Sequence, residues 1–368
     1  MRALVAPILP ATLLLMLLAS GCREPAPPAP PQLQPRASSR TATPPTTDGV
    51  PLEPGGVPAP LAFVHKGDIY LAIVGEATAK PLTHFGNCRC PAWSRDGTQL
   101  AFVRDHKDML DTGAGEAPAG EVWLCKADGS GARKLAESAK DRLGPGISGL
   151  AWDCDDKGIV AMAGLAATSG GLWHIALDGT VTGGKQGANM LQAVASGFAI
   201  AEHNYTRGYG AEEVFVIDGN LKQTGYATEM TDLFPVFSLD CALAAVVNPD
   251  NPKADKSDQK DCITLIAKPA FADAGWLEKN AKGDAAEGKI ADPNGLPTRA
   301  VKAYESALPL GSLAFSPDGR RLAFVAEPRP GNEPSALAQV WLLDLRTREA
   351  SLTLRDGAEP AWQPAPSK

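Results

Sequence analysis

The stretch of this 368-residue chain that carries the most groups able to contact a ligand is Glu202–Tyr209. It contains an imidazole, two phenols and a guanidinium, supplied by His203, Tyr205, Arg207 and Tyr209. Tyrosine and arginine are among the side chains that most often carry the binding energy of protein interfaces. We therefore expect these residues to contact a protein or peptide partner, although the polar rim of any folded domain has a similar composition.

Residues that would support catalysis or metal binding form no recognisable pattern elsewhere in the chain. The histidines are spread out without metal-ligand spacing, and no G-x-S-x-G nucleophile turn occurs. The acidic stretch from Asp250 to Asp261 lacks the spacing and the central glycine of an EF-hand, and lysines interrupt it. We expect no catalytic residues, no metal and no cofactor.

The elements that must position these groups belong to an internal repeat, which is clearest over Pro91–Leu135. A short apolar run ending at Trp93 is followed by the turn Ser94–Gly97, and three further apolar runs follow at 100–103, 122–125 and 133–136. Parts of this pattern recur down the chain, at Tyr70, Trp152, Trp173, Phe215, Phe237, Phe315 and Trp341. A repeat of four short strands predicts an all-β fold built from similar sheets.

Six copies predict a six-bladed β-propeller of four-stranded antiparallel blades. The predicted blades cover residues 61–86, 88–137, 146–184, 189–227, 229–306 and 308–356. The first copy lacks its opening strand, and Pro360–Gln363 repeats Pro91–Ser94 at the far end of the chain. We therefore expect the C-terminal strand to complete the first blade and close the ring, which leaves no open sheet edge.

The turn at Trp93–Gly97, followed by Leu-Ala-Phe-Val at Leu100–Val103, resembles the TolB-type (WD40-like) propeller repeat. The resemblance covers about residues 61 to 364 and implies the same six-bladed fold. Members of the TolB family carry an additional N-terminal α/β domain, and a different kind of segment stands in that place here. The partners of that family are therefore not carried over to this chain.

Six cysteines other than Cys22 are present, and an even number in an exported protein favours disulfides. Cys125 is predicted near the end of a third strand and Cys154 in the first turn of the next blade, so both lie at one face of the ring. We prefer a disulfide between these two. Zinc binding by Cys88 and Cys90 is an alternative, although no histidine or second close cysteine pair lies nearby.

The N-terminal residues 1–22 have the pattern of a targeting segment, with Arg2, the apolar run Leu13–Leu18 and small residues leading to Cys22. This ending resembles a bacterial lipobox, which implies lipidation of Cys22, and an ordinary secretory peptide is the alternative. Arg23 stands where an aspartate would retain the protein in the inner membrane, so outer-membrane attachment is favoured. Residues 23–60 are rich in proline and predict a disordered tether, and residues 61–368 form the propeller.

The composition narrows the class of partner. The formal charge of −7 and the lack of a basic stripe argue against nucleic acid. In such blades, connections entering the first strand and loops between the second and third strands emerge on one face, and here those loops are long, at 104–120, 202–212 and 247–261. We predict a monomeric, non-catalytic outer-membrane lipoprotein, facing the periplasm or the cell surface, that binds a protein or peptide there or in the channel. A hydrolase or lyase with a metal-dependent site in the propeller channel is the alternative.

Overall fold

The computed structural model describes residues 49–111, 116–138, 143–164, 171–203, 212–227, 235–249, 260–267, 271–273, 300–327 and 337–365. These residues belong to one compact unit that spans Thr47–Lys368. The predicted targeting segment with Cys22, and residues 23–48 of the predicted tether, lie outside the described residues. The described part of the chain holds no helix with the length and hydrophobicity that a membrane crossing requires.

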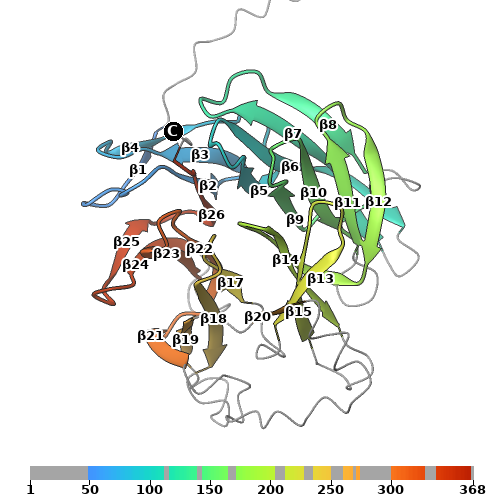
Figure 1. The fold of residues 1–368 in the computed structure, drawn as a ribbon. Coiled ribbons are helices and arrows are strands. Elements are labelled where there is room, and N and C mark those ends of the chain that lie inside the picture. Colours follow the sequence, from blue (N-terminus) through green and yellow to red (C-terminus); the bar gives the residue numbers. More distant parts are fainter. Residues whose placement is uncertain are drawn as a thin grey trace, which may run out of the picture. The chain divides into compact units, whose positions relative to one another are not determined.

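Six antiparallel sheets follow one another in chain order around a ring, which confirms the predicted fold class (Figure 1). Blades 1 to 3 are formed by β2 (Leu61–His65), β3 (Asp68–Ala72), β4 (Thr78–Pro81) and β26 (Ala358–Trp362); by β5 (Cys88–Trp93), β6 (Gln99–Asp111), β7 (Glu116–Lys126) and β8 (Arg133–Glu137); and by β9 (Gly149–Trp152), β10 (Gly158–Ala163), β11 (Gly171–Ala176) and β12 (Val181–Gln186).

Blades 4 to 6 continue the same arrangement. They are formed by β13 (Ala188–Val194), β14 (Gly197–His203), β15 (Glu212–Ile217) and β16 (Gln223–Ala227); by β17 (Val236–Phe237), β18 (Leu243–Pro249), β19 (Asp261–Ala267) and β21 (Ala300–Ser306); and by β22 (Leu310–Phe315), β23 (Arg321–Ala326), β24 (Gln339–Asp344) and β25 (Ala350–Leu354). Two short strands, β1 (Val50–Pro51) and β20 (Phe271–Asp273), add a fifth strand to blades 1 and 4.

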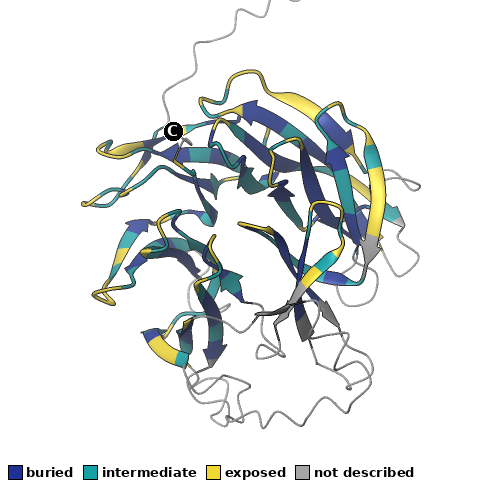
Figure 2. Cartoon of the chain, in the orientation of Figure 1, coloured by how far each residue is buried: buried dark blue, intermediate teal, exposed yellow. Residues whose placement is uncertain are grey.

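The hydrophobic core lies between neighbouring blades. Among the described residues, six apolar clusters are found, and each joins the facing sheets of two adjacent blades. Because successive side chains of a strand point to opposite faces, each inner strand contributes to two clusters, and the middle strands are buried on both sides. Figure 2 shows this burial along the middle strands, with exposed residues on outermost strands such as β12 and β21.

The C-terminal strand closes the ring as predicted. β26 pairs antiparallel with β2, so that Trp362 lies opposite Leu61 and Ala361 opposite Ala62. The indole N–H groups at the ends of inner strands donate to the preceding blade in the same way at three joints: Trp93 to Ala361 O at 3.2 Å, Trp152 to Ala92 O at 2.9 Å, and Trp362 to Ala314 O at 3.0 Å. The closing joint therefore uses the same contact as the two joints formed by Trp93 and Trp152.

The Ser-x-Asp turn of the repeat has a direct structural role. Ser94 Oγ accepts the backbone N–H of Gln99 at 2.9 Å and donates to Asp96 Oδ1 at 2.6 Å. Ser238 and Ser316 make the same two contacts in blades 5 and 6. The hydroxyl thus closes the hairpin between the first and second strands, which explains why the sequence pattern marks these turns.

The propeller unit begins before residue 61, which corrects the predicted boundary of the tether. Val50 of β1 pairs with Ala79 of β4, and the N–H of Leu52 donates to Ala77 O at 2.9 Å. Val50 and Val57 are 8% and 3% exposed and pack between blades 6 and 1. The proline-rich composition predicts disorder for this segment. The segment is nevertheless ordered, because an existing sheet edge supplies its backbone partners and only a few apolar side chains are needed to hold it.

Candidate functional site

The loop predicted to bind a partner lies mostly outside the described residues. Tyr205, Arg207 and Tyr209 are not described, and His203 is described only as the last residue of β14. The end of β14 lies on the face where the β6–β7 and β18–β19 connections also emerge, here called the long-loop face. The opposite face, with the turns that follow the first and third strands, is called the short-turn face. The predicted role of these four residues stays a prediction.

The predicted disulfide between Cys125 and Cys154 is absent from the structure, in which both residues are free cysteines. Cys125 is buried and packs against blade 1, in the cluster that contains Cys88 and Leu100. Cys154 is exposed in the turn after β9 of blade 3. The two residues share one face of the ring, as predicted, but the side chain of Cys125 points to the side of its sheet that faces away from blade 3.

The buried thiols are also poorly suited to metal binding or redox chemistry. Burial raises the pKa of the Cys88 thiol to about 11 and that of the Cys90 thiol to about 12, so both are protonated at neutral pH. Burial raises the pKa of Cys125 to about 12 as well. Across the described ranges, no group of three or more His, Cys, Asp or Glu side chains is placed to hold a metal ion.

An aromatic and arginine cluster lies on the long-loop face between blades 1 and 2. It consists of Phe85, Arg104 and Trp123 and is called the rim cluster below. The ring centroids of Phe85 and Trp123 are 4.9 Å apart, and the guanidinium carbon of Arg104 lies 5.5 Å from the centroid of Phe85. The Phe85 residue is 36% exposed, so the cation–π contact is accessible from solvent.

The rim cluster stands on a firmly held base. Glu121 is buried beneath the cluster. It accepts a hydrogen bond from Trp123 Nε1 at 2.8 Å and forms an ion pair with Lys134 at 3.1 Å. Burial alone would raise the pKa of Glu121, but hydrogen bonds from Trp123, His106 and Lys134 outweigh it and lower that pKa. The adjacent β6–β7 hairpin projects further and exposes Met109.

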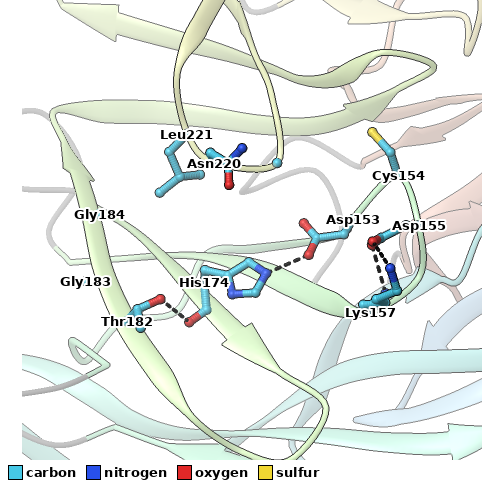
Figure 3. Close-up of a pocket in the computed structure, with 11 residues that line it drawn as sticks. Asp153, Cys154, Asp155, Lys157, His174, Thr182, Gly183, Gly184, Asn220 and Leu221 are labelled. Atoms are coloured by element: carbon cyan, nitrogen blue, oxygen red, sulfur yellow. Dashed lines mark hydrogen bonds and ion pairs between the residues drawn. The ribbon is translucent and has the colours of Figure 1, made fainter.

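A separate pocket of about 880 Å³ lies between blades 3 and 4 on the short-turn face and is called the Asp153 pocket. Blade 3 contributes the turn after β9, part of β11 and the start of β12, and blade 4 contributes the β15–β16 turn (Figure 3). The polar and apolar side chains that line it include Asp153, Cys154, His174, Thr182, Asn220 and Leu221.

Asp153 and His174 point toward one another across this pocket (Figure 3). His174 Nε2 lies 2.6 Å from Asp153 Oδ2, and because a carboxylate accepts, the imidazole donates from Nε2. A Cβ atom on Gly158 would lie 2.5 Å from His174 Nε2 and 2.7 Å from Asp153 Oδ2. The glycine therefore leaves the space in which the pair forms.

The other blades show that this pair is a departure from the repeat. The strand registers place Asp153 at the position of Ser94 and His174 at the position of Leu124. The equivalents of His174 in the remaining blades are all apolar: Leu71, Val216, Leu265 and Leu342. Blade 3 has thus changed two positions that are far apart in sequence and in contact in space.

Reading the sequence did not identify this pair. The repeat pattern marks Trp152 and not the Asp153 beside it, and His174 is one of the histidines that lack metal-ligand spacing. Aligning all six copies column by column would have shown an acidic and an imidazole side chain replacing a hydroxyl and an aliphatic one in the same blade. The informative feature is that two positions of one blade both differ from the equivalent positions of the other blades. Residue spacing along the chain does not reveal this difference.

The described residues thus define a closed six-bladed β-propeller. No protein-family model matches the sequence, and no curated protein matches it. The fold is similar to that of TolB from Acinetobacter baumannii, with 14% identity, a TM-score of 0.55, and coverage of 83% of this chain and 67% of that one. This chain therefore has the fold of a TolB-type six-bladed propeller.

Further similar structures include the periplasmic gluconolactonase of Pseudomonas aeruginosa, with 11% identity, a TM-score of 0.45, and coverage of 84% of this chain and 99% of that one. The propeller domain of the Trilobed protease from Pyrococcus furiosus has 12% identity and a TM-score of 0.43, with 83% of each chain covered.

Proposed function

We propose that this protein is a non-catalytic envelope lipoprotein whose propeller binds a protein or peptide partner on the long-loop face. The observation that carries the proposal is the rim cluster of Phe85, Arg104 and Trp123, which presents an exposed aromatic ring and a guanidinium on a rigid base. Aromatic and arginine side chains anchor protein interfaces because they bury a large area and lose little conformational freedom.

The loop residues predicted to bind a partner would add to the long-loop face. Tyr205, Arg207 and Tyr209 follow β14, whose end emerges on the same face as the rim cluster. Loops on a rigid propeller can vary without loss of the fold, which suits them to recognition. The targeting pattern that ends at Cys22 supports an envelope location, with the lipid holding the protein at the outer membrane and the propeller reaching toward its partner.

Substitutions on the long-loop face should abolish partner capture and leave the fold intact. We expect the Phe85→Ala, Arg104→Ala double variant to lose at least 10-fold in the amount of partner retained from envelope extracts, because anchor residues contribute about 2 kcal/mol or more each. The Tyr205→Ala, Arg207→Ala, Tyr209→Ala variant should lose a similar amount. Capture is measured by affinity purification and quantitative mass spectrometry, and folding by circular dichroism.

The matched control changes two turns on the short-turn face. Asp128 and Asp178 each accept a backbone N–H two residues ahead, from Ser130 at 2.9 Å and Thr180 at 2.8 Å. Their replacement with alanine should weaken these turns and leave capture unchanged. Loss of capture in this control alone would place the partner on the opposite face and contradict the proposal.

Replacing Cys22 with serine should release the protein from the membrane fraction. Stable anchoring depends on acyl chains, and the formal charge of −7 on the chain disfavours its adsorption to anionic lipid. Fractionation of cells followed by immunoblotting measures this, with the variant expected in the soluble periplasmic fraction. An unchanged membrane fraction would show that the lipid is not the main anchor.

A further inference from the structure

The Asp153 pocket contains a buried acceptor with an unmet hydrogen-bonding requirement. The side chain of Asp153 is 9% exposed, and its Oδ2 atom accepts from His174. Its Oδ1 atom has no hydrogen-bond partner among the described residues. Buried carboxylate oxygens are nearly always paired, because leaving one without a partner costs about 1 to 3 kcal/mol or more.

This carboxylate is not needed to build the turn. At the same position in blades 2, 5 and 6, a serine closes the hairpin through its hydroxyl. Blade 3 keeps the backbone bond that these turns share, from Asp153 N–H to Gly158 O at 3.0 Å, and the Asp153 side chain bonds to His174 instead of to the turn. The Asp153 side chain is therefore available to the pocket, and His174 fixes its orientation.

We infer that the Asp153 pocket binds a small organic cation, an alkylammonium or guanidinium group, through Asp153 Oδ1. In Figure 3 this oxygen points away from His174, on the side where Asn220 lies, and it is buried just beneath the pocket surface, so binding requires a small movement of the lining side chains. Since Nε2 of His174 donates to Asp153, its Nδ1 atom is an acceptor in the neutral ring. Thr182 and Asn220 add a hydroxyl and an amide to the lining, and the oxygens of both groups can accept hydrogen bonds.

With the His174 ring neutral, the other charged groups near the pocket do not balance the charge of the Asp153 carboxylate. Lys157 forms an ion pair with Asp155 at 2.8 Å, so these two residues cancel one another. The guanidinium of Arg95 lies beyond Cys154, at 3.4 Å from its sulfur, and donates to the carbonyl oxygens of Val194 and Gly197. No cation of the described residues reaches Asp153 Oδ1 itself, which favours a cationic ligand over an anion.

The test is isothermal titration calorimetry of the purified full-length protein with agmatine, which carries both a guanidinium and an ammonium group. Butylurea is the neutral analogue, and zinc chloride tests for a metal. We expect agmatine to bind with one site per chain and Asp153→Asn to weaken it by about 10-fold or more, because that change removes the charge and preserves the shape. Butylurea should not bind measurably.

A second variant separates binding from folding. Asp153→Ser with His174→Leu restores residues found at these positions in other blades, so it should fold with an unchanged or higher melting temperature and bind no agmatine. A short peptide with one arginine and neutral flanks distinguishes two sources of the same group. Tighter binding than agmatine would indicate a peptide side chain, and weaker binding would indicate a free small cation.

Three results would overturn the inference: no binding of agmatine, equal binding by the wild type and Asp153→Asn, or zinc binding that depends on Asp153 and His174 in the absence of any cation binding. The site lies on the face opposite to the rim cluster. The Phe85→Ala, Arg104→Ala variant should therefore bind agmatine as the wild type does. The proposed cation site and the proposed partner surface can thus be refuted separately.

Discussion

Replacement of Trp362 with alanine should lower the free energy of unfolding by about 3 to 5 kcal/mol, as expected for a large aromatic side chain removed from a core. Trp362 is 6% exposed and packs between blades 6 and 1, where its indole also donates to Ala314 O at 3.0 Å. The loss is measured by urea denaturation, followed by tryptophan fluorescence and circular dichroism.

Two further variants test whether the loss of stability follows the amount of buried side chain removed. Trp362→Phe keeps most of the apolar ring and removes the indole donor, so it should cost less than the alanine variant, about 1 to 3 kcal/mol. Val74→Ala changes a side chain on a residue that is 54% exposed and should stay within about 0.5 kcal/mol of the wild type. Equal losses for Trp362→Ala and Val74→Ala would contradict the packing described here.

Removal of residues 359–368 tests ring closure more severely. The truncation takes away most of β26, leaves β2 with an unpaired edge, and removes Trp362 from the core between blades 6 and 1. We expect it to prevent accumulation of folded protein or to lower the melting temperature sharply. A truncated protein that melts within a degree or two of the intact chain would show that the ring does not depend on its C-terminal strand.

The blades and their closure were predictable because the repeat encodes each turn locally. A serine, an aspartate and a glycine within four residues determine the hairpin after Trp93, and these contacts need no information from distant parts of the chain. The predicted second blade, 88–137, coincides with the observed span from β5 to β8. The closing strand followed from the same local pattern, since Pro360–Gln363 repeats Pro91–Ser94.

The contacts between blades were not predictable in the same way. The Cys125–Cys154 pair was chosen from the face of the ring, but which side of the sheet Cys125 occupies depends on strand register. A shift of one residue reverses the side to which every side chain of a strand points. The rim cluster was not predictable for the same reason. Phe85, Arg104 and Trp123 come from a connection and two strands, and strand register brings them together.

Blade 4 shows how a turn can form without the repeat's residues. Its first hairpin contains Ala195 and Ser196 and lacks the Ser-x-Asp-Gly sequence, so the pattern does not define it. In the structure, Val194 pairs directly with Gly197, and the N–H of Ala195 donates to Leu239 O of blade 5 at 2.7 Å. The turn is thus held in part by blade 5, and Gly197 is the residue that permits its close pairing.

Gly197→Ala should destabilise the propeller by on the order of 3 kcal/mol or more. Gly197 has a φ angle of 153°, and a Cβ atom there would overlap the carbonyl oxygen of Ile217 in β15. Relief requires the β14–β15 pair to separate, because the obstacle is backbone that cannot rotate away. Urea denaturation measures the loss.

Gly75→Ala is the matched control, since Gly75 also has a positive φ angle, 79°, but a Cβ atom there would meet nothing within 4 Å. Gly75→Ala should lower the free energy of unfolding only by the cost of placing an alanine at a positive φ angle, about 1 to 2 kcal/mol. The difference between the two variants isolates the steric contact with Ile217. Equal losses would mean that blade 4 can shift to accept the methyl group, and that the close approach of Gly197 to β15 is not what fixes this turn.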